Sequence, residues 1–375
     1  MIELRTDCRH FKGDRPCAPH KSYGVLCGNC SYYQKRGKRV LLIKLGAAGD
    51  VLRTTPILHP IRKKFPGAEI TWVTHFPAFV TGVVDKVVPL PLPDASGARH
   101  SSNFMTFWST MIGQRFDALY SLDKDPLACA IASQVKADGS WGFTLKEGCC
   151  HPINALAEEA WEIGLFDPIS RANRKSYPQM LFDICGFSFK GEPYLMAAPK
   201  QIEFLSLPGT APMVGLNIGC GDRWPMRRWP DTCWETLAMG LQRQGAAVLI
   251  LGGAQEHECS QSLARQTGAI YPGVRPLEEF FSLVNRCDLV VTSVSMAMHV
   301  ALALRKRLVL LNNIFNKHEF ELYGLGEILE PMPACECYYP TACDRNCMSC
   351  ISPEAVLRSC LRQLESVSLL SPMKA

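Results

Sequence analysis

Short apolar runs that alternate with helix-forming segments most restrict what this chain can fold into. In the stretch RVLLIKLGAAGDVLR (39–53), an apolar run precedes a turn of small residues and then a helical segment. Runs that stay apolar at successive positions are typical of parallel strands that helices cover on both faces. We predict strands at 39–44, 69–75, 86–90, 116–122 and 138–143.

The alternation stops over 145–210 and then restarts, which indicates a second α/β unit. We predict strands at 212–219, 246–253, 288–293 and 307–313. We predict helices at 231–244, 255–266, 276–286 and 295–304. The 375 residues are long enough for two domains, which we place at 39–210 and 211–330. Because ligands of such sheets bind at the carboxyl ends of the strands, we expect the site in the central cleft.

Composition narrows the class of protein. The chain is 47% hydrophobic and 20% charged, with a net charge of +5, which suits an enzyme with an acidic small ligand and does not require nucleic acid. No apolar stretch reaches the length of a membrane span, and the N-terminus lacks a signal core. We therefore expect a cytoplasmic protein. The basic segment 35–39 is either a solvated linker or a peripheral contact with the inner membrane.

The turn Gly46–Gly49 leads directly into Asp50, at the expected start of a helix. Small residues let a ligand approach the backbone, and the following helix offers free N–H groups. The dinucleotide-binding pattern of three spaced glycines is absent. Two interpretations of Asp50 stay open, a helix N-cap or a catalytic carboxylate. Lys44 and Gly49 are expected to line the same cleft.

The loop NIGCGDRWPMRRWPD (217–231) follows a predicted strand of the second half. Gly219 allows a tight turn, and Arg227 and Arg228 stand just before a helix start. Guanidinium groups in this position can clamp a diphosphate. Two solvated surface arginines are the simpler alternative.

Two later turns of the second half add candidate binding residues. Gly252 and Glu256 follow a strand, and Glu256 either accepts hydrogen bonds from a ribose diol or only favours a helix start. Ser295 and Met296 open the helix after strand 288–293, and His299 lies one turn after Ser295 on the same face. A histidine in an apolar helix is more often a core residue than a catalyst, so both roles stay open.

Nine of the 18 cysteines lie in two terminal stretches. Because reduced cytoplasmic cysteines seldom form a disulfide framework, both sets predict a structural metal, zinc or iron, and an iron–sulfur cluster also fits four thiolates. The N-terminal module, 1–38, holds Cys8, Cys17, Cys27 and Cys30. The C-terminal finger, 331–352, has five cysteines; either Cys335 or Cys337 is spare, and we assign Cys337, Cys343, Cys347 and Cys350 as ligands. A C-terminal helix over 353–375 follows.

Four motifs in order give the chain a family resemblance. KLGAAGD (44–50), PMRRWP (225–230), LGG-x2-E (251–256) and SMAMH (295–299) resemble those of glycosyltransferase family 9, the ADP-heptose heptosyltransferases of lipopolysaccharide biosynthesis, over residues 39–330. The resemblance implies a GT-B fold of two Rossmann-like domains, with the acceptor at the first and the donor nucleotide in the second. The terminal cysteines resemble a subgroup of autotransporter heptosyltransferases with an iron-binding finger.

The resemblance also implies roles for individual residues. Asp50 would be the general base of an inverting transfer from ADP-heptose, and Arg227 would contact the donor phosphates. No catalytic metal is expected. One departure is that Val294 and Met296 stand where many members carry Asp and Gly, so a carboxylate is lost from the donor site.

Two other functional classes stay open. The chain could be a metal-bearing scaffold on a transferase-like fold without turnover, or a nucleotide-sugar epimerase. The acceptor is either a lipopolysaccharide core sugar or a protein hydroxyl, and the sequence leaves a homo-oligomer open. A DNA-binding zinc ribbon is disfavoured by the modest net charge.

Overall fold

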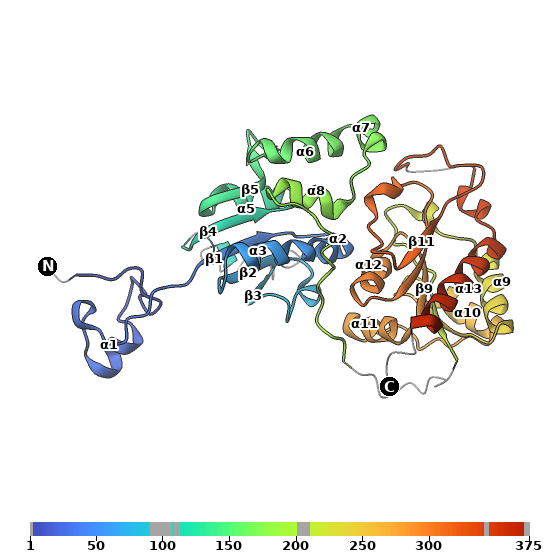
Figure 1. The fold of residues 1–375 in the computed structure, drawn as a ribbon, viewed down its shortest axis with the longest axis horizontal. Helices are drawn as coiled ribbons and strands as arrows, with labels where there is room; N and C mark the ends of the chain where they lie inside the picture. Colours follow the sequence, from blue (N-terminus) through green and yellow to red (C-terminus); the bar gives the residue numbers. More distant parts are fainter. Residues whose placement is uncertain are drawn as a thin grey trace.

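The computed structural model describes residues 3–90, 107, 108, 111, 113–200, 211–340 and 345–370. A small N-terminal module, a first α/β domain and a second α/β domain follow one another along the long axis (Figure 1). The predicted ligand Cys343 and residues 371–375 of the predicted C-terminal helix lie outside the described residues. Within the described ranges, no helix is both long and apolar enough to cross a membrane.

The first domain is built on a six-stranded sheet with the order β3-β2-β1-β4-β5-β6. All neighbouring strands are parallel except β6, which pairs antiparallel with β5. The strands are β1 (Arg39–Ile43), β2 (Glu69–Thr74), β3 (Lys86–Pro89), β4 (Arg115–Ser121), β5 (Lys136–Lys146) and β6 (Cys149–Pro152). The chain continues on the opposite side of β1 when it reaches β4, so the order reverses between these two strands.

Alternation along β1 explains why helices cover both faces of this sheet. Val40 and Leu42 pack in one apolar cluster with α2 and α3, whereas Leu41 and Ile43 pack in another with α5. Successive side chains of a strand point to opposite faces, so an unbroken apolar run requires two covers. The helices of this domain are α2 (Ala48–Thr54), α3 (Leu58–Lys64), α5 (Pro126–Gln134), α6 (Glu158–Leu165), α7 (Asp167–Ala172) and α8 (Tyr177–Ile184).

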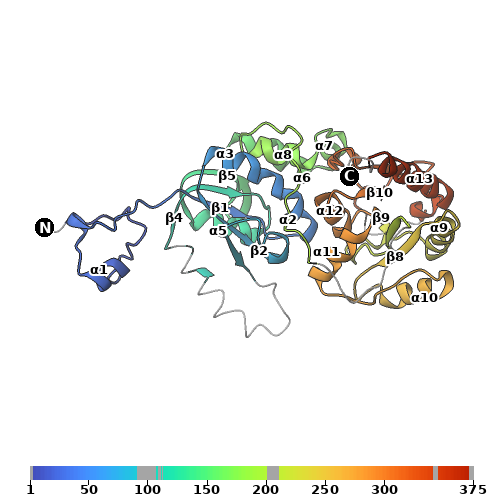
Figure 2. The same ribbon diagram turned by 60° about the horizontal axis from the view of Figure 1, so that its bottom comes forward.

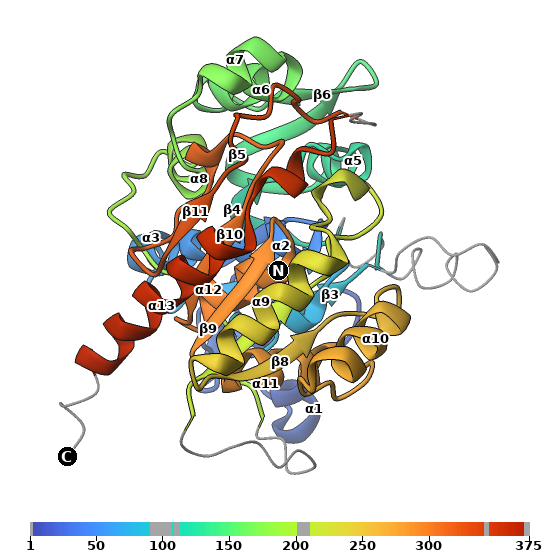
Figure 3. The same cartoon turned by 90° about the vertical axis from the view of Figure 1, so that its right-hand side faces the viewer.

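The second domain repeats this architecture on a five-stranded parallel sheet of order β11-β10-β9-β7-β8. Its strands are β7 (Met213–Asn217), β8 (Ala247–Leu251), β9 (Leu289–Ser293), β10 (Arg307–Leu311) and β11 (Gly326–Leu329). Its helices are α9 (Asp231–Arg243), α10 (His257–Thr267), α11 (Leu277–Arg286), α12 (Met296–Ala303) and α13 (Pro353–Leu370). Helices α9 and α13 cover the outer face (Figure 3), while α11 and α12 lie on the face toward the first domain (Figure 1). Here the strand order reverses between β7 and β9.

The two domains meet through helices at the carboxyl ends of their strands. α12 packs against α2, and the rings of Phe79 and Phe281 lie 5.1 Å apart across the boundary. One buried apolar cluster therefore includes side chains from both domains.

Both predicted α/β halves are confirmed, with two strands that the sequence prediction lacked. The segments of β6 and β11, CCHP and GEIL, are short and only half-buried or exposed. Neither has the continuous apolar run from which the other strands were predicted. Each lies at the edge of its sheet, where one side is left unpaired and less apolar surface is buried.

Candidate active site

A large cavity opens at the carboxyl ends of β1 and β4, where the order of the first sheet reverses. It has a volume of about 820 Å³, and Arg223, Glu319 and Tyr339 of the second half of the chain form part of its wall. Doubly wound sheets bind ligands at such reversal points. The cavity is large enough for a sugar substrate.

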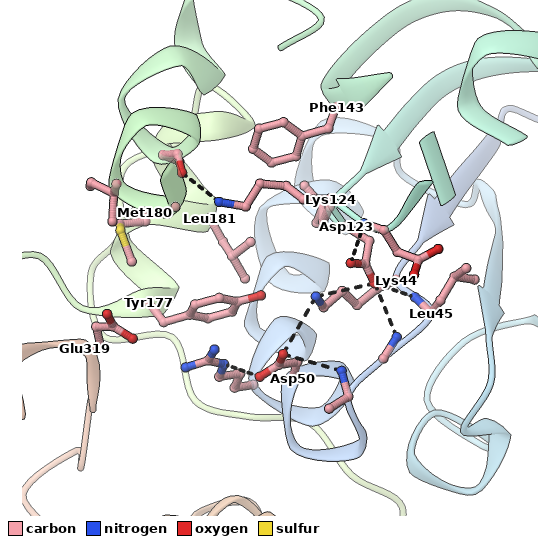
Figure 4. Close-up of a pocket in the computed structure, with 18 of the residues that line it drawn as sticks. Lys44, Leu45, Asp50, Asp123, Lys124, Phe143, Tyr177, Met180, Leu181 and Glu319 are labelled. Atoms are coloured by element: carbon pink, nitrogen blue, oxygen red, sulfur yellow. Dashed lines mark hydrogen bonds and ion pairs between the residues drawn. The ribbon is translucent and has the colours of Figure 1, made fainter. Parts of the chain in front are cut away.

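Asp50 reaches this cavity from the first turn of α2, as Figure 4 shows. The N-cap of α2 is Ala47, so Asp50 is the third residue of the helix and not its cap. Its Oδ2 accepts a hydrogen bond of 3.4 Å from the Ala47 amide. Its Oδ1 lies 2.9 Å from Nε of Arg53, and its side chain stays 32% exposed. The carboxylate is therefore anchored on one side and accessible on the other.

Neighbouring cations keep Asp50 ionised. Burial favours the protonated acid, but the positive charges of Arg53 and Lys44 outweigh burial and hold the pKa of Asp50 below its ordinary value. The helix amide at Ala47 contributes less than these groups. Side-chain cations, and not the helix amides, are therefore the main cause of the low pKa of Asp50.

Lys44 and Asp123 form the floor beside Asp50. Lys44 lies at the end of β1 and Asp123 just after β4, and their charged atoms are 3.5 Å apart. Asp123 also accepts hydrogen bonds from the amides of Leu45 and Gly46, at 3.0 and 3.2 Å. Burial opposes the charge of Lys44, but Tyr177, Asp123 and Asp50 leave its pKa raised. Lys44, which is 5% exposed, therefore remains a fixed cation.

Several cavity residues were missed from the sequence. The guanidinium carbon of Arg53 stacks 3.5 Å from the ring centroid of Tyr177, and Glu319 faces the same space from the second domain (Figure 4). Burial raises the pKa of Glu319. Arg53 had a usable signal, because it stands three positions after Asp50 on the same helix, where two side chains are neighbours. Asp123 had one as well, because it directly follows a strand.

Gly49 lies where the two domains approach each other closely. A Cβ at Gly49 would lie 2.4 Å from Cδ2 of His299, so only glycine fits without movement. His299 is 6% exposed, and its Nδ1 lies 3.3 Å from the hydroxyl of Tyr194. Burial, and then the charge of Arg53, lower the pKa of His299 to about 3. His299 is therefore a neutral contact residue beside Asp50.

A second cavity of about 400 Å³ lies at the reversal point of the second sheet. Gly219, Gly252, Glu256, Ser295 and Met296 all line it, so five predicted donor residues are brought together. The side-chain amide of buried Asn217 joins the two strand ends, because it donates to Thr292 at 3.0 Å and Ser295 at 3.3 Å. The start of α12 faces this cavity, and one turn later His299 reaches α2. The two cavities thus flank one interdomain contact.

Glu256 and two glycines shape the second cavity. A Cβ at Gly219 would lie 2.6 Å from the carboxyl carbon of Glu256, and one at Gly252 would lie 3.2 Å from its Cβ. Oε2 of Glu256 accepts a 2.9 Å hydrogen bond from the Gly253 amide. Leu277 and Phe280 add an apolar wall. Such a cavity can hold a flat apolar base and a polar diol together.

The two predicted arginines occupy different surroundings. Arg227 is buried and donates to the backbone carbonyls of Trp224, Val294 and Cys220, so it connects the loops that border the second cavity. Arg228 is exposed, lies 2.9 Å from the Cys259 sulfur and 3.3 Å from Asp231, and lines neither of the two cavities described above. Arg223 was not predicted, yet it lines the large cavity and lies 4.3 Å from the ring centroid of Trp224.

The C-terminal finger brings three cysteines together. The sulfur atoms of Cys335, Cys337 and Cys347 lie within 4.8 Å of one another, which suits a metal ion. Cys335, which the sequence prediction set aside, is thus in the group, while Cys350 is exposed. The same segment contacts the first domain, because the hydroxyls of Tyr338 and Ser170 are 2.6 Å apart.

Comparison with known proteins relates these sites to one family. The model of glycosyltransferase family 9 (heptosyltransferase) matches residues 191–324. Lipopolysaccharide heptosyltransferase 2 of Escherichia coli K12 is 23% identical over 289 residues, which are 73% of this chain and 82% of that protein.

Solved structures share the fold. The family 9 glycosyl transferase from Veillonella parvula has a TM-score of 0.67 at 19% identity and matches 88% of this chain and 97% of its own. The dodecameric, iron-containing heptosyltransferase TibC from enterotoxigenic E. coli, solved with ADP-D-beta-D-heptose, has a TM-score of 0.52 at 12% identity. That match covers 89% of this chain and 79% of TibC.

Proposed function

Because the chain belongs to glycosyltransferase family 9, we propose that it transfers a heptose from ADP-heptose to an acceptor hydroxyl, with inversion at the anomeric carbon. The observation that carries this proposal is an ionised carboxylate, Asp50, on the wall of the large cavity, next to the contact that separates this cavity from the donor cavity. TibC and a heptosyltransferase from E. coli have been solved with ADP-heptose or its fluoro analogue.

The donor nucleotide would occupy the cavity of the second domain. Leu277 and Phe280 offer apolar surface to the adenine, and the Glu256 carboxylate can accept hydrogen bonds from the ribose diol. The amides that follow Ser295 open α12 and point a helix N-terminus at the diphosphate. These backbone groups would partly replace the carboxylate missing at Val294.

Basic side chains would balance the diphosphate without a catalytic metal. Arg227 lines neither of the two cavities, so it would contact a phosphate only after it exchanged one of its carbonyl acceptors for a phosphate oxygen, whereas Arg223 already lines the large cavity. Arg228 would have to leave Asp231 and Cys259 first. Charge-assisted hydrogen bonds of this kind stabilise the leaving group as negative charge develops on it.

Transfer would proceed in one displacement. The acceptor oxygen bonds to C1 of the heptose while the bond from C1 to the phosphate oxygen of ADP breaks. Asp50 takes the hydroxyl proton, and ADP leaves with the electron pair of the broken bond. Lys44 and Arg53 hold the carboxylate in place. Attack opposite to the leaving group inverts C1.

The acceptor would lie in the large cavity, as a lipopolysaccharide core sugar or a protein hydroxyl. The walls combine the Lys124 amine with the apolar side chains of Phe143, Met180 and Leu181 (Figure 4). Lys124 donates to the carbonyl of Ala160 at 3.0 Å, so its position is fixed. An acceptor with both an anionic group and an apolar face would fit this wall.

The cysteine finger would hold a structural metal, zinc or iron. Three close sulfur atoms supply soft thiolate ligands, and Cys350 or Cys343 would complete four. A metal bound there would stabilise the segment that carries Tyr338 and Tyr339. TibC is iron-containing and dodecameric; for this chain, iron and a homo-oligomer are proposals.

Binding and turnover of the donor test this function. We expect calorimetry to show tighter binding of ADP-heptose than of UDP- and GDP-sugars, and mass spectrometry to show ADP release that disappears in Asp50→Ala. A protein that binds ADP-heptose but never releases ADP, with acceptor present, would favour a scaffold. Release of an altered nucleotide sugar would favour an epimerase.

A further inference from the structure

The N-terminal module, residues 3–38, lacks an apolar core. Its buried residues are Cys8 and Pro19, and the hydrophobic clusters found in the described part of the chain include no residue before Val40. A segment of fewer than about 40 residues seldom holds a fold without disulfides, a metal or a partner. Something other than apolar burial must therefore stabilise it.

Four cysteines of this module surround one small cavity. Cys8, Cys17, Cys27 and Cys30 all line a cavity of about 30 Å³, and none is in a disulfide. This volume suits a single ion or water molecule and leaves no room for an organic ligand.

Backbone contacts hold these cysteines in place. Cys8 forms an antiparallel bridge with Lys35, and the carbonyl of Cys17 accepts a 3.0 Å hydrogen bond from the Lys21 amide. Cys17 occupies the N-cap of α1 (Ala18–Tyr23) without a side-chain capping bond. Cys27 and Cys30 flank a single 3-10 turn.

We propose that Cys8, Cys17, Cys27 and Cys30 bind one Zn²⁺ as a closed, structural four-thiolate site. Four thiolates satisfy a tetrahedral ion and leave no position for substrate. A cavity this small favours a single ion over an iron–sulfur cluster, which needs space for several atoms. Arg5 and His10 also line the cavity and can offset the negative charge of the thiolates.

This site is independent of the proposed transferase activity. In Figures 1 and 2 the module lies apart from both α/β domains, and a single extended segment connects it to the first domain. Among the described residues, three ligand atoms lie within 4.8 Å of one another only in the C-terminal finger, so the N-terminal sulfur atoms are farther apart than this in the structure. We expect the N-terminal sulfur atoms to draw together as zinc binds, because metal binding and folding are coupled in such modules.

Metal content of the full-length protein tests the proposal. We expect Cys27→Ser/Cys30→Ser to contain one zinc per chain fewer than the wild type by inductively coupled plasma mass spectrometry. Cys149→Ser, an exposed cysteine of the first domain, is the matched control and should lose none. ADP-heptose binding should be unchanged in both variants. That result would show that the metal was lost without unfolding, and failure of the transferase proposal would leave the zinc count unaffected.

Differential alkylation of the wild-type protein tests whether these four thiols bind zinc, without the need for a variant. In zinc-loaded protein, the four N-terminal thiols should resist alkylation and then react after chelation, as mass spectrometry of the peptides would show. The proposal is overturned by unchanged zinc in the double variant. Iron or sulfide at the site, or disulfides among these cysteines in protein purified under reducing conditions, would equally overturn it.

Discussion

Asp50→Asn is the substitution that most directly tests the proposed mechanism. It removes the charge and the proton acceptor but keeps the side-chain shape. Loss of a general base lowers turnover by about 10²–10⁴-fold, or about 3–5 kcal/mol in the barrier. The donor cavity belongs to the other domain, so we expect the affinity for ADP-heptose to stay within a few-fold of wild type.

The structure limits how much stability this variant should lose. Lys44 keeps Asp123 at 3.5 Å, and Arg53 keeps its stacking on Tyr177. Because the Asp50 side chain is 32% exposed but its partner Arg53 is only 15% exposed, losing this ion pair should cost more than for a pair open to solvent, about 1–3 kcal/mol. Thermal unfolding would measure this cost.

Asp117→Asn supplies the matched control. Asp117 is also a carboxylate with one lysine partner, Lys38 at 2.5 Å, and one backbone amide partner, Arg39 at 2.8 Å. It lies near the amino end of β4, whereas the cavity lies at the carboxyl ends of the strands. This variant should retain turnover, measured as ADP release with acceptor present.

The pH profile separates Asp50 from Glu319 as the base. Because the pKa of Asp50 is depressed, the rate should hold down to about pH 4 and fall only below the ordinary aspartate value. If Glu319, whose pKa burial raises, were the base, the rate would fall at a higher pH and Glu319→Gln would abolish it. Wild-type turnover in Asp50→Asn would refute the assignment of Asp50.

Three further predictions concern the interdomain contact and the donor cavity. Gly49→Ala should lower stability by about 1–3 kcal/mol and reduce turnover, because its Cβ must move about 1 Å away from His299. Gly37→Ala is the control, because the nearest atom to its added Cβ would be 3.7 Å away. Thermal melts and turnover assays should show no change in this control. Neutral His299 should make the protein lose stability as pH falls from about 6.5 toward 3, since the unfolded chain binds a proton that the folded chain excludes; denaturation at pH 7.5 and 4.5 should show a smaller difference in His299→Asn. Glu256→Gln should weaken ADP-heptose binding about tenfold by calorimetry, and unchanged affinity would remove Glu256 from the ribose site.

Much of the fold was predictable because its signals are local. The apolar runs of β1, β7, β8, β9 and β10 are buried on both faces, so each carries its own pattern. Asp50 and Glu256 were found in the same way, because each stands where a strand has ended and a helix begins. Family motifs then linked these positions to a transferase.

Contacts between distant segments had no such pattern. Asp123 forms an ion pair with Lys44 only because β4 pairs with β1. Gly49 must be glycine only because His299 of the other domain packs against it. Nothing in the sequence indicated that Arg227 has partners within the protein, yet the packing of the loops places three backbone carbonyls within reach of its guanidinium group.

The sequence by itself determined the two α/β halves, the order of their motifs and the residue types available for chemistry. Only the tertiary structure decided which of those residues meet. The physical reason is that the period of apolar residues sets strands and helices locally, whereas charge pairs and close approaches depend on how sheets and domains pack across long stretches of chain.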